Sequence, residues 1–221
     1  MSVIAQAGAK GRQLHKFGGS SLADVKCYLR VAGIMADYSQ PDDMMVVSAA
    51  GSTTNQLISW LKLSQTDRLS AHQVQQALRR YQSELISGLL PPEVADGLIG
   101  AFIHDLERLA GLLDSGVNDA VYAEVVGHGE VWSARLMSAV LNQQGLESAW
   151  LDARDFLRAE RGAQPQVDEG LSYPLLQQLL AQHPGKRLVV TGFISRSNAG
   201  ETVLLGRNGS DYSATQVGAL A

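Results

Sequence analysis

The feature that most restricts the fold of this chain is a repeated unit, in which a short strand-like run ends in a loop of small residues and a helical pattern follows. The strand-like residues 13–17 lead into a Gly-Gly-Ser-Ser loop at 18–21, and apolar side chains then recur at helical spacing over 22–38. The run 44–47 likewise leads through small and hydroxyl residues into a helical pattern at 54–63. Repeated strand–loop–helix units are typical of a parallel sheet covered by helices. The sequence therefore predicts an α/β protein.

The remaining chain adds helices and then returns to the sheet. Residues 70–113 carry two helical patterns that break at Pro91 and Pro92, with Ser70 and Pro92 as the expected helix starts. We interpret 70–114 as a helical insertion with little chemistry in it. The later segments predict a helix at 118–141, strands at 148–151 and 187–192, a helix at 171–182 between these strands, and a hairpin at 193–205 that turns at 198–200.

The last helical pattern bears on whether the fold is finished within this sequence. Ser210 or Asp211 suits its start as a helix cap, and its apolar face still continues at Leu220 and Ala221, where the sequence stops. A helix of this kind in an α/β fold returns to a further strand. We therefore expect the chain to be truncated, with more sheet beyond Ala221 in a longer parent protein.

Composition narrows the class of protein. A chain of 221 residues with 45% hydrophobic content can bury a large core, and a net charge of −4 without clusters of Lys and Arg gives no footprint for nucleic acid. We expect no membrane partner and a cytoplasmic location, because no run suits a signal peptide or a membrane span. Cys27 is the only cysteine and the five histidines lack metal-site spacing, so we expect a packed thiol and no metal held by the protein alone.

The first candidate site lies in the loop after the first predicted strand. Gly18 and Gly19 let backbone N–H groups approach an oxyanion closely, Ser20 adds a hydroxyl, and the helix that follows has a positive N-terminal end. Lys16 precedes the glycines, whereas the lysine of a Walker A loop follows them. We interpret this segment as a phosphate-binding loop, and the alternative is a tight turn with a surface lysine.

The second candidate site follows the next predicted strand. Ser48 and Thr54 lie where that strand ends in small hydroxyl residues before a helix. Loops at the carboxyl ends of parallel strands meet at one edge of a sheet, so we expect both side chains to face the same crevice as Lys16. The alternative is that Thr53 or Thr54 only caps the helix.

The third candidate site is the Gly-His-Gly-Glu segment 127–130, with Ser133, inside a long helical pattern. Glycine costs about 1 kcal/mol inside a helix, so two of them predict a bend or a close approach of another segment. Glu130 would then point into a cleft, where a carboxylate suits a ligand ammonium group. The alternative is a solvated glutamate, and His128 is assigned no role because the sequence identifies no partner for a proton relay.

The fourth candidate site is the segment 206–213, which opens the last helix. Arg207 offers a planar fork that matches a carboxylate, and Ser210 and the free N–H groups at the helix start can receive an anion. Asp211 can hold a cation or a lysine. The alternative is a capping loop with a surface arginine.

Together these four segments resemble, in the same order, the signature segments of the aspartokinases, and the resemblance extends over the whole chain. Within that family the motif sequences are most similar to those of the enterobacterial bifunctional members of the methionine branch, which also carry a homoserine dehydrogenase. The resemblance implies the amino-acid kinase fold, a three-layer α-β-α sandwich with a largely parallel sheet, incomplete here at the C-terminus. Residues 1–221 would form the N-terminal part of the catalytic domain, with the insertion at 70–114.

The resemblance also implies a role for each candidate residue. Lys16 and Asp211 would be catalytic, with Asp211 organising the site rather than acting as a base. Asn208 stands where a glycine is usual in the family, which affects the geometry of that loop. The phosphate-binding set would be Lys16, Gly18, Gly19, Ser20 and Ser48, and the substrate-binding set Thr54, Glu130, Arg207 and Ser210.

The implied reaction is the ATP-dependent phosphorylation of the side-chain carboxylate of L-aspartate. ATP with Mg²⁺ and L-aspartate would be the ligands, NADP would serve only the dehydrogenase part, and the full-length parent would form a homo-oligomer. The nucleotide-contacting segment of the family has no counterpart in these residues. Two alternatives stay open: a kinase of the same family for another acid, such as glutamate or acetylglutamate, and a binding or assembly fragment without turnover.

Overall fold

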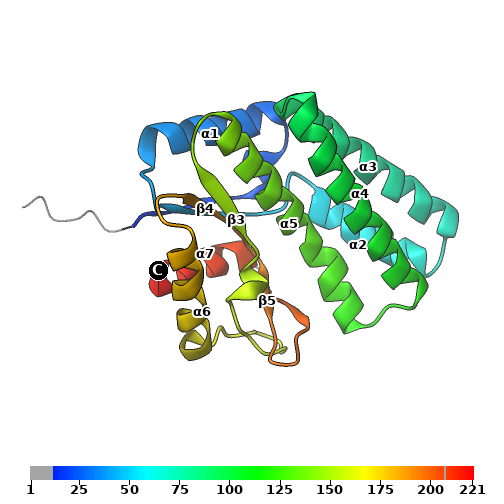
Figure 1. Ribbon diagram of the computed structural model, residues 1–221. Coiled ribbons are helices and arrows are strands. Elements are labelled where there is room, and N and C mark those ends of the chain that lie inside the picture. Colours follow the sequence, from blue (N-terminus) through cyan, green and yellow to red (C-terminus); the bar gives the residue numbers. More distant parts are fainter. Residues whose placement is uncertain (1–11, 207) are drawn as a thin grey trace, which may run out of the picture.

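The computed structural model describes residues 12–206 and 208–221. Its centre is a parallel sheet of four strands in the order β1-β2-β4-β3 (Figure 1). The register pairs Lys16 with Val46 and Val46 with Val190, so that β1, β2 and β4 end at the same edge. The strands span Leu14–Phe17 (β1), Met44–Val47 (β2), Ser148–Leu151 (β3) and Arg187–Thr191 (β4).

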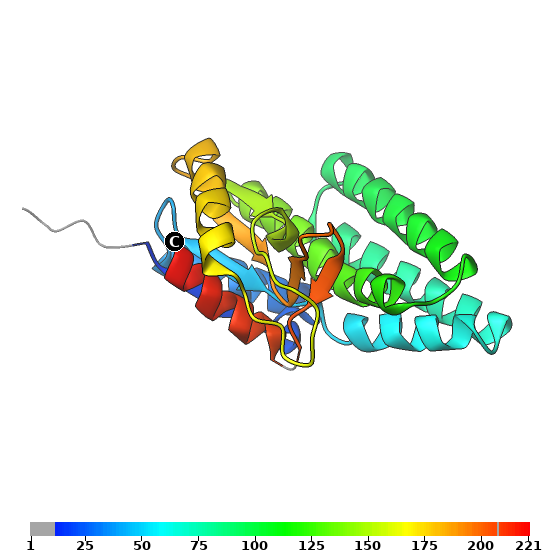
Figure 2. The same ribbon diagram turned by 90° about the horizontal axis from the view of Figure 1, so that it is seen from below.

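Both faces of the sheet are covered, which explains why β2 is apolar at every position. Met45 and Val47 pack into one core with helices α1 and α5, whereas Met44 and Val46 pack into a second core with α6 and α7. Figures 1 and 2 show these helix pairs on opposite sides of the sheet. The three-layer α/β architecture predicted from the sequence is therefore confirmed. The helices span Val25–Tyr38 (α1), Asp119–Gln143 (α5), Glu169–Gln182 (α6) and Gly209–Leu220 (α7).

Three further helices extend from the sheet beside α5 (Figure 2). They are α2 (Thr53–Ser64), α3 (Arg68–Leu89) and α4 (Pro92–Asp114). The expected start at Pro92 is confirmed, but the expected start at Ser70 is wrong. The cap is Asp67, whose carboxylate accepts hydrogen bonds from the N–H groups of Leu69 and Ser70. An Asp directly before a helix offers an acceptor as good as that of a serine.

The loops around the sheet contain the predicted hairpin and two short 3-10 helices. The hairpin strands are Ile194–Arg196 (β5) and Thr202–Leu204 (β6), and they pair antiparallel. The 3-10 helices cover Gly19–Leu22 (η1) and Ala153–Asp155 (η2). Within the described residues, none of the helices has the length and apolar character that a membrane crossing needs.

Candidate functional site

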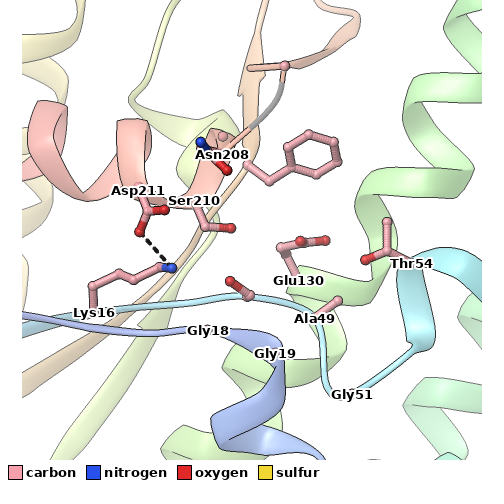
Figure 3. Close-up of a pocket in the computed structure, with 14 residues that line it drawn as sticks. Lys16, Gly18, Gly19, Ala49, Gly51, Thr54, Glu130, Asn208, Ser210 and Asp211 are labelled. Carbon is pink, nitrogen blue, oxygen red and sulfur yellow. Dashed lines mark ion pairs between the residues drawn. The ribbon is translucent and has the colours of Figure 1, made fainter.

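A cavity of about 350 Å³ lies at the edge where β1, β2 and β4 end (Figure 3). The starts of α2 and α7 and the middle of α5 complete its wall. Two helix N-termini at one cavity provide free N–H groups and positive dipole ends, which suits an anionic ligand. The lining residues are Lys16, Gly18, Gly19, Ser48, Ala49, Gly51, Thr54, Glu130, Phe193, Gly206, Asn208, Gly209, Ser210 and Asp211.

The loops after β1 and β2 touch each other through their backbones. The N–H of Gly51 donates to the carbonyl of Gly19 at 2.9 Å. A Cβ atom on Gly19 would lie 2.7 Å from the carbonyl oxygen of Ala49, and Gly51 has a positive φ of 53°. Both positions therefore need glycine, one for close approach and one for a left-handed backbone. The glycine pair of the first loop and the glycine of the second are parts of one packed unit.

Lys16 at the end of β1 and Asp211 in the first turn of α7 form an ion pair. The Nζ–Oδ1 distance is 2.7 Å, and the two side chains are 29% and 62% exposed (Figure 3). The ammonium group also lies beside the first loop, since a Cβ atom on Gly18 would be 3.6 Å from it. The most distant predicted motifs thus meet at one place. An exposed pair of this kind contributes little to stability, so its groups are free to exchange partners with a ligand.

Glu130 on α5 is the one buried carboxylate of the cavity wall. Its residue exposure is 3%, and its Oε2 atom has no hydrogen-bond partner among the described residues. Burial raises the pKa of Glu130 to about 8, against smaller opposing hydrogen bonds from backbone N–H groups, including that of Ala49. The alternative of a solvated glutamate is therefore wrong. An unpartnered acid at a cavity wall is suited to a cationic ligand group.

The two glycines before Glu130 serve close packing rather than a bend, because α5 runs unbroken through them. A Cβ atom on Gly129 would lie 2.8 Å from the Ala49 side chain, and one on Gly127 would lie 2.5 Å from Ile194. His128 between them is buried beside two acids, with Nε2 3.4 Å from Asp105 and Nδ1 3.7 Å from Glu124. Asp105 lies on another helix and Glu124 lies one helical turn before His128. Neither acid was connected with His128 from the sequence.

The loop that opens α7 differs from the expected capping. The N-cap is Asn208, with a left-handed φ of 56° and no side-chain cap, and Ser210 and Asp211 lie inside the first turn. The interpretation of Ser210 or Asp211 as the cap is therefore wrong. Gly192 at the end of β4 packs against Ser210, where a Cβ atom would meet its Oγ at 2.7 Å. This contact fixes the start of α7 at the sheet edge.

Most of the candidate residues named from the sequence line the cavity. The exceptions have different reasons. Ser20 is exposed in η1 and lies outside the lining set. Arg207 lies outside the described residues. Ser133 is also outside the lining set, and its Oγ is hydrogen-bonded to the Tyr28 hydroxyl at 3.0 Å.

Phe193 is the lining side chain that the sequence analysis missed. It follows β4 and has a left-handed φ of 66°, which is rare for a bulky residue. Its ring lies against Gly209, where a Cβ atom would come within 2.5 Å of Cδ2. A phenylalanine in a predicted hairpin gives no local sign of a ligand site, whereas the glycine at 209 indicated that something packs closely there.

The residues described also bear on metal binding. No group of three or more His, Cys, Asp or Glu side chains that could hold a metal ion occurs within 12–206 and 208–221. A single carboxylate, Asp211, faces the cavity from α7. Mg²⁺ that accompanies a nucleotide takes most of its ligands from phosphate and water, with one or two carboxylates from the protein. Asp211 is therefore placed to contact a magnesium ion that a phosphate ligand would bring.

The fold and the site are those of an α/β protein with a cavity suited to an anion at the sheet edge, and comparison with known proteins identifies its family. Residues 11–221 match the Amino acid kinase family. The chain belongs to this family. It is 91% identical over its full length to the bifunctional aspartokinase/homoserine dehydrogenase 2 of Escherichia coli K12, and it covers 27% of that protein. The family predicted from the four motifs is thereby confirmed.

Two further relatives agree with the first. The chain is 31% identical over 204 residues to the lysine-sensitive aspartokinase 3 of Escherichia coli K12, covering 90% of this chain and 44% of the relative. A crystal structure of E. coli aspartokinase III in complex with aspartate and ADP matches with a TM-score of 0.85 at 27% identity, over 95% of this chain and 46% of that one. The chain thus spans about a quarter to a half of the length of these relatives.

Proposed function

We propose that this chain is the substrate-side part of the catalytic domain of an aspartate kinase. The enzyme would transfer the terminal phosphoryl group of ATP to the side-chain carboxylate of L-aspartate and form 4-phospho-L-aspartate. The observation that carries the proposal is the cavity whose wall includes the glycine loop, the Lys16–Asp211 pair and the buried Glu130, whose Oε2 has no hydrogen-bond partner among the described residues. A ligand with an ammonium group at one end and a phosphoryl group at the other matches this distribution of charge. The 91% identity to a bifunctional aspartokinase supports the same substrate.

The nucleophile in this reaction needs no activation by the protein. An aspartate side chain has a reference pKa of about 3.9, so it is ionised at neutral pH and no general base is required. One carboxylate oxygen forms a bond to the phosphorus while the bond from phosphorus to the bridging oxygen of ADP breaks. Catalysis then consists of in-line positioning and of neutralising charge on the moving phosphoryl group.

The candidate residues divide into two groups under this proposal. Lys16 and the N–H groups of Gly18 and Gly19 lie together and would stabilise charge on the phosphoryl group, with Ser48 beside them. Asp211 orients Lys16 through the 2.7 Å ion pair. The second group would hold aspartate: Glu130 its α-ammonium group, Arg207 a carboxylate, and Thr54 and Ser210 hydrogen-bond acceptors on the substrate.

ATP and Mg²⁺ are the proposed nucleotide and metal ligands. The matched aspartokinase III crystal contains ADP with aspartate, which supports nucleotide binding by the family fold. Asp211 is the carboxylate that would contact Mg²⁺, whose charge would offset that of the phosphates. We further propose a cytoplasmic, homo-oligomeric parent protein that acts at the first step toward lysine, methionine and threonine. The 27% coverage of a bifunctional relative supports a parent that also carries a homoserine dehydrogenase with NADP.

The same coverage favours a second candidate function for the 221 residues by themselves. The chain spans 27% of one relative and 46% of another, and the second candidate is a fragment that binds aspartate without turnover. A kinase for another acid is the third candidate. Glu130 argues against acetylglutamate, because an acetylated amino group has no charge for a carboxylate to meet.

The decisive experiment is a coupled kinase assay of the whole protein that carries these residues and, separately, of the 221-residue chain. Product should be trapped with hydroxylamine, which converts an acyl phosphate to a hydroxamate and so identifies carboxylate phosphorylation. We expect turnover of L-aspartate by the whole protein, with L-glutamate and N-acetyl-L-aspartate as matched controls at least about tenfold poorer. Equal rates with N-acetyl-L-aspartate would remove the role of Glu130, and hydroxamate from glutamate alone would replace the substrate.

A further inference from the structure

Two adjacent side chains of α3, Tyr81 and Gln82, make polar contacts with the segments that form the cavity, although neither lines it. We propose that they are positioning residues that hold the two glycine loops in register, so that the α3–α4 hairpin sets the rate of phosphoryl transfer from outside the site. The proposal rests on the proposed function for its kinetic readout only. It replaces the expectation that this helical segment carries little chemistry.

Gln82 controls the loop after β2 through one relayed contact. The side chain is buried at 3% exposure, and its Nε2 donates to the Oγ1 of Thr53 at 2.9 Å. Thr53, itself fully buried, donates its Oγ1–H to the carbonyl of Ala50 at 2.6 Å. The Gln82 amide therefore orients the Thr53 hydroxyl, and this hydroxyl holds the loop at Ala50. Thr53 directly precedes Thr54, which lines the cavity.

Tyr81 touches both loops with one hydroxyl group. Its O–H donates to the carbonyl of Ala23, at the end of the first loop, at 3.0 Å. The same oxygen lies against the second loop, since a Cβ atom on Gly51 would be 2.8 Å from it. Gly51 in turn donates its N–H to Gly19 at 2.9 Å. The hydroxyl thus braces the point where the two loops exchange their backbone hydrogen bond.

The arrangement indicates positioning rather than ordinary packing. A helix packs against a protein with apolar side chains, and a buried amide such as Gln82 is unfavourable unless it is hydrogen-bonded. Here two consecutive residues direct polar groups to backbone segments that line the site. Phosphoryl transfer depends on in-line geometry, in which a displacement of about 1 Å lowers rates by up to 100-fold. Stabilising the loops in one position is therefore a way for α3 to affect the reaction.

The kinetic test uses Tyr81→Phe and Gln82→Met in the whole protein, with Gln73→Met, an exposed position of the same helix, as the matched control. We expect kcat to fall by roughly tenfold in each test variant while KM for aspartate changes by less than about threefold, and the control to match wild type. Thr53→Val should give the same fall. The double variant Gln82→Met with Thr53→Val should be no slower than the slower single variant, because both substitutions break the same hydrogen-bond relay.

A second readout does not depend on the reaction. Hydrogen exchange of the Gly51 amide should be faster in both test variants and unchanged in the control, because that amide bonds across the two loops. Wild-type kcat in both variants, or additive losses in the double variant, would overturn the proposal. If the wild-type protein phosphorylates no aspartate, the proposed function fails, and unaltered exchange at Gly51 would still refute the positioning role independently.

Discussion

Lys16 and Asp211 lie near opposite ends of the sequence and form an ion pair of 2.7 Å at the cavity, and the proposed reaction assigns the catalytic role to this pair. Asp211 is 62% exposed, and loss of its partner leaves it in water. Removing the ammonium group should therefore affect the reaction far more than the fold, since exposed pairs contribute little to stability.

Lys16→Ala should lower kcat of the whole protein by roughly 100- to 1000-fold, because in the proposed reaction its ammonium group stabilises charge that develops in the transition state. KM for aspartate should change by less than about threefold. Lys62→Ala, an exposed lysine of α2 outside the cavity, is the matched control and should have wild-type kinetics. A change confined to KM would instead assign Lys16 to substrate binding, with Arg207.

Glu130 should make aspartate binding dependent on pH. Burial raises its pKa to about 8, so the carboxyl group is mostly protonated at neutral pH in the free protein. Pairing with an ammonium group requires the ionised form, and we therefore expect aspartate affinity to rise as the pH is raised through neutrality toward 8. Calorimetry in buffers of different ionisation enthalpy should detect proton release on binding, and Glu130→Gln should abolish it. Binding without proton release in the wild type would contradict a protonated Glu130.

The stability of the ligand-free protein offers a second measure of the same group. A folded-state pKa near 8, above the unfolded value of 4.5, means that stability is lost as the pH rises between these values. Glu130→Gln should therefore unfold like the wild type near pH 4 and exceed it at neutral pH by an amount on the order of 3 kcal/mol. Urea denaturation across pH measures this difference, which a solvated glutamate would not show.

At the scale of elements, Glu124 connects α5 to the strand hairpin and to η2. Its Oε2 accepts hydrogen bonds from Arg154 at 2.8 Å and from the Thr202 hydroxyl at 2.6 Å, and its Oε1 accepts one from Arg108 of α4 at 2.8 Å. Burial alone would raise the pKa of Glu124, but these partners, Arg154 foremost, hold it at about 2. One carboxylate thus joins α4, η2 and the hairpin strand β6 to α5.

Glu124→Gln should destabilise the protein by about 2 to 3 kcal/mol at neutral pH, because it leaves the mostly buried Arg154 with only Asp152 as an acidic partner. The folded-state pKa lies below the unfolded value, so the stabilisation exists above pH 4.5 and is lost as the pH falls toward 2. The gap between variant and wild type should shrink over this window in urea titrations. Glu107→Gln, an exposed glutamate on α4, is the control, and an equal effect there would refute the network.

At the scale of the whole molecule, the cavity wall includes Glu130, Thr54 and Ser210 of the residues proposed to hold aspartate, whereas the chain covers 27% of its bifunctional relative. We expect the isolated 221-residue chain to bind L-aspartate with a dissociation constant in the millimolar range, about −4 kcal/mol, because ion pairs in an open site are weakened by water. Calorimetry with L-aspartate, and D-aspartate as the control, measures this. We expect little or no turnover from this chain, and a rate on the order of 10 s⁻¹ would show that no further residues are needed.

The amino-acid sequence by itself determined the secondary structure and the family, because these depend on local patterns. The apolar run of β2 and the proline at the start of α4 each act within a few residues of their own positions. The start of α3 was misplaced because two neighbouring polar residues, Asp67 and Ser70, can both cap a helix.

The tertiary structure alone decided which groups face one another and how far each is from water. The pKa of Glu130 depends on its burial in the folded protein, Phe193 lies at the cavity because β4 and α7 meet there, and Tyr81 reaches the glycine loops from a helix that showed no motif. The burial of a group and its distance from other charges are set by segments distant in sequence. Coulomb energies change several-fold with the effective dielectric constant around the group. Local pattern therefore predicted most of the residues that line the cavity, and packing determined their electrostatics and the contacts that hold them in place.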